Sequence, residues 1–357
     1  MNLESHFRII AGEEQGLKPM AIRATLAVAS GFYLLGYTAR QAAYSLGFAR
    51  SATVDAKVIS IGNITAGGTG KTPATIYFAR KLQEAGRRVV VLSRGYGRSS
   101  RMDRPLVVSD GAKTLVASRE AGDEPWLIAR KLTRTPVVVC ADRIKGAEFA
   151  IERFRADTIV LDDGFQHIAL KRDEDIVVLD CAVPFGYGHL LPRGLLREPL
   201  SALKRATRFL LTHADKYEHD ETEARLRDIN PTAQVLKSRH RPVKLISAKD
   251  GTVQNCASLS GRRVVVFSGI GNPKSFEDTI RRLGAQTVGN FRYVNHHWYD
   301  SRDIEAVIQS AKQSNADYIV TTEKDWVRLS LLDVVPENLF LLEIELELLN
   351  CPPSGVL

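Results

Sequence analysis

The sequence has few cysteines, and their spacing suits neither a metal site nor a disulfide framework. The four cysteines are scattered over 357 residues without a C-x-x-C pair, at Cys140, Cys181, Cys256 and Cys351. Zinc sites and disulfide-stapled folds need closely spaced or abundant cysteines. Neither is predicted, and this cysteine usage is typical of a reducing cytoplasm.

Signals for secretion and for nucleic-acid recognition are also missing. The opening MNLESHF lacks the basic and then apolar order of a secretory signal. We find no repeat, no low-complexity segment and no motif that interleaves aromatic with basic residues. A nucleic-acid-binding module is therefore permitted only by the charge of the chain.

That charge is strongly positive. The chain has 49 Lys and Arg against 41 Asp and Glu, a net charge of +8 and a pI near 9.3. This balance predicts an anionic partner, which could be a nucleotide, a phosphorylated substrate, an acidic membrane or a nucleic acid. The length of 357 residues favours two domains over one.

One segment near the N-terminus is apolar. Residues 24–39, ATLAVASGFYLLGYTA, carry no charge and lie between Arg23 and Arg40. The run is shorter than the roughly 20 residues that span a bilayer as a helix, whereas a helix lying in the membrane surface has no such requirement. Two interpretations stay open, a membrane-surface anchor and a buried domain helix.

From residue 51 onward, short β-rich runs alternate with helical stretches, which is typical of an α/β fold with a mostly parallel sheet. We predict a P-loop NTPase-type sheet, a second and smaller α/β domain, and an N-terminal apolar helix. Candidate strands are 57–62, 88–93, 135–140, 157–162, 175–180, 208–213, 262–269, 317–322 and 338–345. The predicted divisions are a membrane-associating helical segment (1–50), the P-loop domain (51–235), the C-terminal domain (236–350) and a loose tail (351–357).

The segment ITAGGTGKTP, residues 64–73, lies between the first strand and an amphipathic helix, which is the context of a phosphate-binding loop. Its glycines let backbone N–H groups approach a phosphate, and the helix adds its positive end. Lys71 is placed to reach the terminal phosphates and Thr72 to bind Mg²⁺. The predicted nucleotide-binding residues are Thr65, Ala66, Gly67, Gly68, Thr69, Gly70, Lys71 and Thr72.

Thr65 stands where the pattern G-x-x-x-x-G-K-[ST] has its first glycine. That position shapes the entry to the loop, while the inner glycines and the Lys-Thr pair bind the ligand, so a small hydroxyl residue is compatible. A glycine-rich turn without a ligand is the alternative, and the combination of strand, loop and helix argues against it.

A carboxylate pair supplies the second part of a nucleotide site. In DTIVLDDGFQH, Asp162 ends a hydrophobic strand and Asp163 begins the loop, where a P-loop enzyme holds Mg²⁺. We predict both, with Thr72, as metal-site residues; an ordinary strand-to-turn pair is the alternative. Gly164 follows Asp162 too closely for the GTPase switch D-x-x-G, and THAD at 212–215 matches the guanine-reading [NT]-K-x-D imperfectly.

A kinase also needs a base at the acceptor hydroxyl. In GDEP, Asp123 and Glu124 lie at the expected start of a helix, where a plain helix cap explains them equally well. In NHHWY, His296 and His297 lie in a loop among aromatic residues. Histidine exchanges protons near neutral pH, although packing is the more usual reason for such a pair.

Arginines follow several predicted strands at the carboxyl edge, where open α/β sheets bind ligands. The planar guanidinium suits phosphate recognition, although any one arginine could belong to a solvated face. These residues are Arg94, Arg98, Arg143, Arg193 and Arg197. The residues alone predict a P-loop phosphotransferase, and a P-loop ATPase or GTPase of the partition or metal-delivery type stays open.

A series of motifs, in this order, resembles one family, the tetraacyldisaccharide 4'-kinases of Gram-negative bacteria. They are GNITAGGTGKTP, LSRGYGR, GDEP, ADR, LDDGFQH, PFGYGHLLPRGLLREP, SGIGNP followed by Phe276, NHHWY and TTEKD. The series covers most of the chain and is far more specific than a phosphate loop alone. The family is similar in tolerating Ser or Thr at the first position of that loop.

The resemblance implies phosphorylation, dependent on ATP and Mg²⁺, of the 4'-hydroxyl of tetraacyldisaccharide 1-phosphate to form lipid IVA in lipid A biosynthesis. It implies a peripheral or monotopic protein at the cytoplasmic face of the bacterial inner membrane, docked through its apolar helix. The implied partners are the lipid A disaccharide 1-phosphate and the anionic membrane surface, without nucleic acid and without an obligate protein partner.

By motif, the resemblance also implies roles for single residues. Asp123 and His296 correspond to the acid–base pair, and Lys71 is the third catalytic residue. The implied substrate-binding residues are Arg94, Glu124, Arg143, Gln166, His167, Arg197 and Glu198. One position departs from the family, which usually has D-H-H where this chain has Asn295 before its two histidines, so a carboxylate that could raise the basicity of the histidine is missing.

Overall fold

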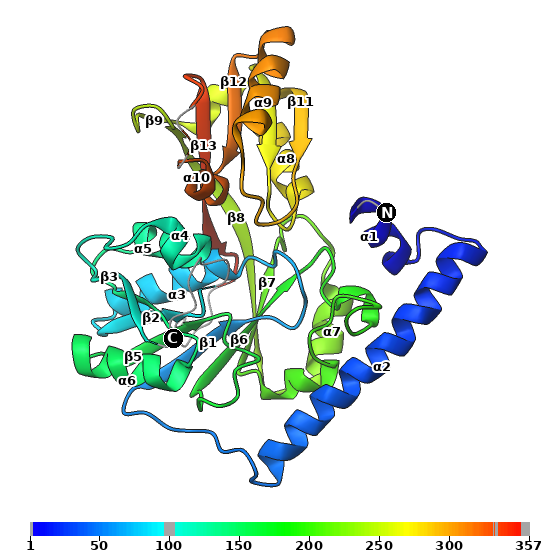
Figure 1. The fold of residues 1–357 in the computed structure, drawn as a ribbon, viewed down its shortest axis with the longest axis vertical. Coiled ribbons are helices and arrows are strands. Elements are labelled where there is room, and N and C mark those ends of the chain that lie inside the picture. The colour runs from blue at the N-terminus through cyan, green and yellow to red at the C-terminus, as the bar shows by residue number, and fades with distance from the viewer. Residues whose placement is uncertain (1–2, 96–103, 331, 333–334, 351–357) are drawn as a thin grey trace.

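Strands and helices alternate along most of the chain in the computed structural model of this protein, which describes residues 3–95, 104–330, 332 and 335–350 (Figure 1). The strands are β1 (Lys57–Gly62), β2 (Val89–Ser93), β3 (Leu106–Ser109), β4 (Val137–Val139), β5 (Thr158–Asp162), β6 (Glu174–Asp180), β7 (Arg208–Thr212), β8 (Gln234–Ser247), β9 (Val253–Gln254), β10 (Arg263–Ser268), β11 (Gln286–Arg292), β12 (Tyr318–Thr322) and β13 (Leu339–Leu348). The helices are α1 (Leu3–Ala11), α2 (Leu17–Ser45), α3 (Lys71–Glu84), α4 (Ser118–Ala121), α5 (Asp123–Lys131), α6 (Arg143–Phe154), α7 (Asp220–Ile229), α8 (Pro273–Arg282), α9 (Ser301–Gln313) and α10 (Glu323–Leu329), with 3-10 turns η1 (Gly186–Gly188), η2 (Leu200–Arg205) and η3 (Cys256–Leu259).

The strands form one continuous sheet. Its order is β11-β10-β12-β13-β8-β7-β6-β1-β5-β2-β4-β3, with β9 paired to β8. Most neighbouring strands are parallel, and the antiparallel pairs are β3 with β4, β8 with β13, and β8 with β9. The predicted α/β fold class, with a mostly parallel sheet and an N-terminal apolar helix, is confirmed.

Side chains of β1 alternate between two faces of the sheet, and both faces are covered. Ile59 packs in a core that includes Phe78 of α3 and Ile128 of α5. Val58, on the opposite face, packs in a core with Ala147 of α6. Burial on both faces explains why the strands of the sheet centre are continuous apolar runs in the sequence.

We keep the predicted boundary near residue 235 as a working division and name residues 51–235 the N-lobe and residues 236–350 the C-lobe. β8 crosses this boundary and pairs with β13 from Ser238 opposite Leu348 to Ser247 opposite Phe340. In Figure 1 these two strands lead from the N-lobe into the C-lobe, which stands above it. The core around α3 includes Leu236 of β8 and Leu346 of β13, so the β8–β13 ribbon packs into the N-lobe, while two further cores lie within the C-lobe.

The nine predicted strands are all present, with ends shifted by up to three residues. Strands β3, β8, β9 and β11 were not predicted. β8 reads QVLKSRHRPVKLIS and β11 reads QTVGNFR, and both contain many partly exposed positions. Neither has the continuous apolar run that identifies a buried strand, so the sequence signal for them is weak.

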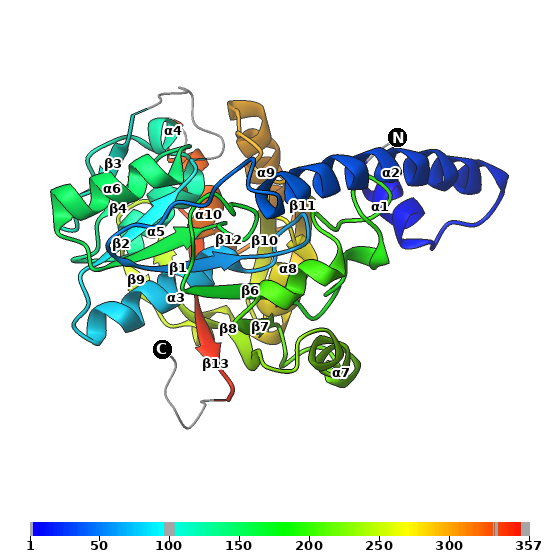
Figure 2. The same cartoon turned by 90° about the horizontal axis from the view of Figure 1, so that it is seen from below.

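Helix α2 lies along the outside of the molecule, and part of it extends beyond the rest (Figure 2). None of its residues is buried, which excludes the interpretation as a buried domain helix. Val28, Phe32 and Leu35 on one of its faces are 65 to 73% exposed. With 29 residues, α2 is longer than the apolar run that predicted it, and by length and composition alone it could cross a membrane. Arg98 and the predicted tail at 351–357 lie outside the described residues.

Candidate active site

A cleft of about 1260 Å³ lies at the carboxyl edge of the N-lobe sheet and is lined by both lobes. Most of the predicted site residues line it, namely Gly67, Gly68, Thr69, Gly70, Lys71, Thr72, Arg94, Glu124, Arg143, Asp163, Gln166, His167, Arg197 and His296. The remaining predicted residues are not in its lining, namely Thr65, Ala66, Asp123, Asp162 and Glu198. The structure therefore brings together, in one place, residues spread over more than two hundred positions of the chain.

The loop between β1 and α3 has the backbone geometry that its glycines predict. Gly67 and Gly70 have φ angles of +116° and +89°, a region that other residues rarely adopt. Gly70 immediately precedes α3, so the positive end of this helix adjoins the cleft. Thr65 forms a β-bridge with Leu196 and has no positive φ, which explains why a residue other than glycine fits there.

A C-lobe loop touches the phosphate-binding loop directly. A Cβ atom on Gly68 would lie 3.1 Å from the Cα of Gly271, and a Cβ atom on Gly271 would clash with the amide nitrogen of Gly68. Beside this contact, Asn272 Nδ2 donates to Asp180 Oδ2 at 3.2 Å across the two lobes. Sequence reasoning did not find these contacts, because they depend on how the lobes are arranged.

Asp162 and Asp163 stand at the end of β5 with different partners. Asp162 is buried and accepts a hydrogen bond from Ser93 Oγ at 2.9 Å. Asp163 has a φ of +53°, and its carboxylate lies 3.5 Å from Lys71 Nζ. Burial raises the pKa of Asp162 to about 6, and the negative charges of Glu124 and Asp163 contribute to the rise.

The chemistry of these groups fits a magnesium ion. Mg²⁺ prefers oxygen ligands and is usually held by one or two carboxylates together with substrate phosphates. Thr72 supplies a hydroxyl in the first turn of α3, beside Lys71. The pKa of Asp162 is raised where carboxylates crowd together, and a divalent cation would offset that crowding.

Asp123 and His296 form a hydrogen bond between the lobes. Asp123 is the first residue of α5 and is 3% exposed, whereas His296 lies in the C-lobe loop after β11. Nδ1 of His296 is 2.8 Å from Oδ2 of Asp123. Burial would raise the pKa of Asp123, but the hydrogen bond from His296 and the charges of Lys324 and Arg328 lower it to about 2. The carboxylate is therefore ionised at neutral pH.

The helix-cap interpretation of GDEP accounts for only one oxygen of Asp123. Gly122 takes the capping position of α5, and Asp123 Oδ1 accepts the backbone N–H of Glu124 in the first turn at 3.0 Å, while Oδ2 contacts His296. The neighbouring Glu124 faces the cleft and accepts a hydrogen bond from Lys324 Nζ of α10 at 2.7 Å. Lys324 lies in the TTEKD motif, for which sequence reasoning predicted no individual role.

Four predicted substrate-binding residues line the cleft on the N-lobe side. Arg143 is buried, and desolvation lowers its pKa to about 10. Gln166 Nε2 donates to the carbonyl oxygen of Asn63 at 2.8 Å. Burial, together with the charge of Arg143, lowers the pKa of His167 to about 4, so this imidazole is neutral. Arg94 is exposed and lines the same cleft.

Arg197 and Glu198 connect the cleft with α2. Arg197 Nη1 donates to Asp163 Oδ2 at 3.0 Å, and the carbonyl oxygen of Arg197 accepts from Tyr33 Oη at 2.8 Å. Glu198 is buried and accepts from Arg205 Nη2 at 2.7 Å and from Tyr37 Oη at 3.4 Å. In this structure Glu198 contacts protein groups, and its contact with a sugar stays a prediction.

Two residues that the sequence offered as candidates point elsewhere. Arg193 Nη1 donates to the carbonyl oxygen of Ile10 in α1 at 2.8 Å. His297 Nε2 lies 2.7 Å from Asp303, and its ring stacks on Tyr293 with centroids 4.7 Å apart. Of the adjacent histidines, His296 is thus the one that lines the cleft.

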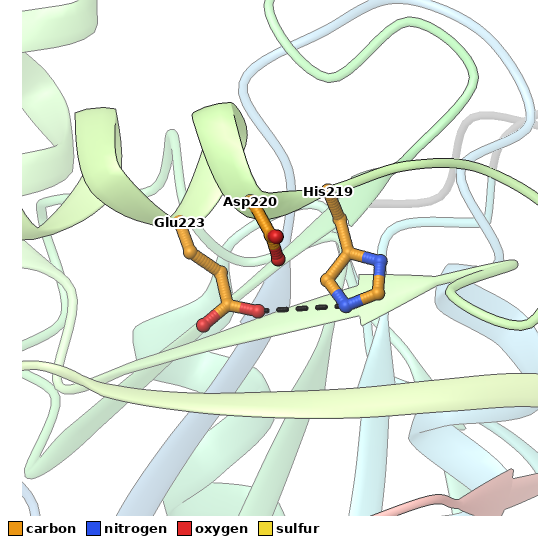
Figure 3. Close-up of side chains that lie close together, drawn as sticks. All are labelled: His219, Asp220 and Glu223. Atoms are coloured by element: carbon orange, nitrogen blue, oxygen red, sulfur yellow. Dashed lines mark ion pairs between the residues drawn. The ribbon is translucent and has the colours of Figure 1, made fainter.

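A separate group of metal-ligating side chains lies at the start of α7. The ligand atoms of His219, Asp220 and Glu223 lie within 4.8 Å of one another (Figure 3). Lys237 Nζ lies 2.5 Å from Glu223 Oε1, and Arg227 Nη2 lies 3.3 Å from its Oε2. These cations already neutralise the carboxylate, so we assign no metal to this group.

Comparisons with known proteins converge on one family. The family model described as Tetraacyldisaccharide-1-P 4'-kinase matches residues 22–354. Proteins named tetraacyldisaccharide 4'-kinase from Anaeromyxobacter sp. (strain Fw109-5) and from Halothermothrix orenii are 42% and 40% identical to the chain, over 96% and 90% of this chain and 92% and 88% of their own. A crystal structure of the "apo" form of LpxK from Aquifex aeolicus in complex with ATP has a TM-score of 0.72 and 31% identity, over 92% of this chain and 95% of that one.

Proposed function

The chain belongs to the tetraacyldisaccharide-1-phosphate 4'-kinase family, and from this membership we propose how its residues divide the reaction. The protein is an ATP-dependent kinase that phosphorylates the 4'-hydroxyl of tetraacyldisaccharide 1-phosphate and forms lipid IVA in lipid A biosynthesis. A partition-type or metal-delivery ATPase or GTPase is not favoured, because the match covers nearly the whole chain rather than the phosphate loop alone.

The phosphate loop takes the ATP phosphates. Residues 65–72 supply backbone N–H groups and the positive end of α3, and the support for this role is the left-handed backbone at Gly67 and Gly70. Lys71 Nζ lies near Asp163 in this structure. We propose that it reaches the terminal phosphates and offsets the negative charge that shifts toward the leaving oxygen during transfer.

Thr72, Asp162 and Asp163 would hold the Mg²⁺ that accompanies ATP. When bound, the ion neutralises phosphate charge and helps to align the transferred group with the acceptor oxygen. The chain's own residues fix the carboxylates in place: Ser93 holds Asp162 through a hydrogen bond of 2.9 Å, and Arg197 holds Asp163 through one of 3.0 Å.

The Asp123–His296 pair takes the proton of the 4'-hydroxyl. His296 lines the cleft, while Asp123 lies behind it, so the imidazole is the member that a hydroxyl in the cleft meets. Asp123 accepts the Nδ1–H of His296, which orients the ring and stabilises the imidazolium that forms. The 2.8 Å contact between these two residues of different lobes is the observation that carries the proposal.

The acceptor binds among cationic and amide side chains that the N-lobe contributes to the cleft. These are Arg94, Arg143, Arg197, Gln166 and His167. Guanidinium groups bind phosphate oxygens with paired hydrogen bonds. We propose that they orient the anionic disaccharide so that its 4'-hydroxyl faces the Asp123–His296 pair, with Glu124 as a further contact.

Helix α2 docks the protein on the cytoplasmic face of the bacterial inner membrane. Val28, Phe32 and Leu35 form an exposed apolar face, and such a helix binds in the headgroup region. Tyr33 and Arg40, on the other side of α2, hydrogen-bond the carbonyl oxygens of site residues 197 and 166. The helix therefore places the acceptor site next to the surface in which the acyl chains are anchored.

Transfer of label from γ-labelled ATP to tetraacyldisaccharide 1-phosphate tests the activity. We expect Mg²⁺-dependent transfer by the parent protein and by Lys249→Ala, which removes an exposed lysine of the C-lobe surface. Lys71→Ala should show none. Absence of lipid-dependent transfer by the folded parent protein, or ATP hydrolysis indifferent to the lipid, would contradict the assigned function.

Flotation with vesicles that contain anionic phospholipid tests the docking. Phe32→Glu with Leu35→Glu places charge on the apolar face of α2 and should abolish flotation. Thr38→Glu adds a charge at an exposed position on the flank of the same helix and should preserve it. Equal flotation of both variants would show that the apolar face of α2 is not the membrane contact.

A further inference from the structure

We propose that Arg328 is a positioning residue for phosphoryl transfer, which holds the loop of His296 and the carboxylate of Asp123 in register between the two lobes. The inference rests on the role proposed above for the Asp123–His296 pair. It concerns a residue that touches neither ATP nor the acceptor, and that sequence reasoning did not single out.

Arg328 lies in α10 and has the largest fully buried side chain among the described residues. Its guanidinium group connects separate segments of the C-lobe. Nη1 donates to the carbonyl oxygen of His297 at 3.1 Å, and Nη2 donates to that of Gly269 at 3.2 Å and to Asp325 Oδ1 at 2.8 Å. Three acceptors at fixed positions suit the rigid fork of arginine and not the single ammonium of lysine.

These acceptors define the backbone of His296. The carbonyl oxygen of Gly269, which Arg328 binds, also accepts the backbone N–H of His296 at 3.2 Å. His296 has a φ of +62°, a left-handed conformation that a residue with a side chain keeps only when its surroundings impose it. Arg328 therefore binds on both sides of the strained residue, at Gly269 and at His297.

The third nitrogen of the guanidinium group, Nε, lies near the other member of the pair. Nε of Arg328 lies 3.8 Å from Oδ2 of Asp123, the same oxygen that His296 contacts, and within the described residues it has no hydrogen-bond partner. A buried donor without a partner is costly, so its orientation toward this carboxylate calls for an explanation. A positive charge at this distance favours the ionised carboxylate that stabilises the imidazolium.

The position of Arg328 is itself fixed. Asp325, fully buried, accepts hydrogen bonds from the backbone N–H of Gly269 at 2.9 Å and from Tyr299 Oη at 2.8 Å in addition to the bond from Arg328. If the buried Arg328–Asp325 pair had only a structural role, changing it would affect the stability of the protein and not the rate of the reaction. A positioning residue acts on the rate of the chemical step and leaves ATP binding unchanged.

The first experiment compares Arg328→Lys with Arg208→Lys, which changes an arginine paired with Glu174 at 2.6 Å, away from the cleft. For Arg328→Lys we expect kcat to fall by about 10²-fold, the usual effect of a small misplacement of reacting groups. KM for ATP should stay within about twofold of the parent value, and Arg208→Lys should change neither constant. A kcat of Arg328→Lys within threefold of the parent value would overturn the proposal.

The second experiment asks whether Arg328 acts through the pair. In a His296→Ala background, Arg328→Lys should lower kcat no further, because groups that act as a unit are not additive. An equal loss in both backgrounds would overturn the proposal while leaving the function of His296 in place. A normal kcat for His296→Ala alone would overturn the acid–base assignment, and this inference with it.

Thermal unfolding of each variant separates positioning from stability. If Arg328→Lys is unfolded at the assay temperature, Tyr299→Phe takes its place, since it removes one hydrogen bond to Asp325 and keeps the charge of Arg328. We then expect a kcat lower by up to about tenfold with unchanged KM for ATP. Normal kcat in folded Tyr299→Phe, or a loss that disappears when the assay is cooled below the unfolding transition, would count against the proposal.

Discussion

The phosphate side and the proton-transfer side of the cleft are built in different ways. Lys71, Thr72, Asp162 and Asp163 all come from the N-lobe. The first two begin α3, which follows β1, and the other two lie at the end of β5, the hydrogen-bonded neighbour of β1 in the sheet. The proton-transfer side joins Asp123 of the N-lobe to a histidine of the C-lobe through one hydrogen bond of 2.8 Å. The residues of the first side belong to one lobe and meet the C-lobe where Gly271 packs on Gly68, whereas the second side exists only while the lobes stay in this arrangement.

This difference indicates which site residues should lose their geometry when the C-lobe is changed. A parallel sheet with both faces buried is rigid, so the N-lobe residues are held by the core itself. The proton-transfer side depends on a few polar contacts across the lobes, among them the pair of Lys324 with Glu124. The variants below test that division, from the largest expected effect to the smallest.

Lys71→Ala should produce the largest loss. Its ammonium is the cation of the phosphate loop, and loss of a charge that stabilises the transition state costs about 10³-fold or more in rate. Lys71 lies 3.5 Å from Asp163, so its loss should lower the thermal unfolding temperature, but only modestly, because Arg197 still pairs with that carboxylate. Kinase assays measure the rate, and thermal unfolding measures the unfolding temperature. Turnover near the parent value would remove the phosphate loop from the mechanism.

Asp123→Asn should lower kcat by about 10²- to 10⁴-fold and leave ATP affinity nearly unchanged, because it removes the charge behind the imidazole and not a phosphate contact. The double variant with His296→Ala should be no slower than the slower single variant, since the pair acts as one unit. Initial rates and ATP binding by calorimetry measure these effects. If the fold-loss in kcat of the double variant equals the product of the two single losses, the two residues act independently.

The same variant has a predictable pH effect on stability. The folded pKa of Asp123 is about 2, below its ordinary value, so the ionised carboxylate contributes stability above the unfolded pKa near 3.9. This contribution is lost as pH falls from about 4 toward 2. The difference in unfolding free energy between the parent and Asp123→Asn should therefore shrink over that range, and a constant difference would contradict the depressed pKa.

Lys324→Met should have a moderate effect. It removes the partner of Glu124 where both side chains are about one-fifth exposed, at 19% and 23%. Because water reaches this pair, we expect a loss of about 1–2 kcal/mol in unfolding free energy, less than for a fully buried pair. Lys244→Met is the control and should lose less, because this lysine is 37% exposed and lies 3.4 Å from its partner on the β8 ribbon. Chemical denaturation of both variants decides the order.

Asn295→Asp should have the smallest effect. The residue is exposed, and solvent and salt screen a charge placed there from the neighbouring imidazole. We expect kcat to change by less than about threefold, which corresponds to under 1 kcal/mol. A gain of tenfold or more would show that the carboxylate usual in the family tunes His296 strongly, and that this chain works without it.

The contrast between the two sides also explains what could be predicted from the sequence. The phosphate loop, Asp162 and Asp163 were predicted from contiguous residues, because strand, loop and helix determine their geometry locally. The GDEP and NHHWY motifs gave Asp123 and His296 only as candidates, since each motif has an ordinary structural explanation by itself. Lys324 and Asn272 lie in quoted motifs without a predicted role, and Arg328 lies in none, because their contacts cross between segments that only the folded arrangement brings together.

The sequence failed to predict β8 for a related physical reason. β8 carries charged side chains along a ribbon that is only partly covered, so its sequence resembles a polar connection and not a strand. The same polarity led us to place the domain boundary near residue 235, within the element that joins the lobes. Strands buried on both faces, such as β1 and β5, were predicted to within one residue at their ends.

The backbone contact between Gly68 and Gly271 couples the mutational tolerance of two distant loops. A methyl group at position 271 would press on a phosphate loop that carries no change of its own, so we expect the two positions to tolerate substitution together or not at all. A saturation library at residue 271, assayed for ATP-dependent activity, would therefore test the geometry of the phosphate loop from the other lobe. Under selection for ATP use, residues other than glycine should be lost at position 271 as strictly as at position 68.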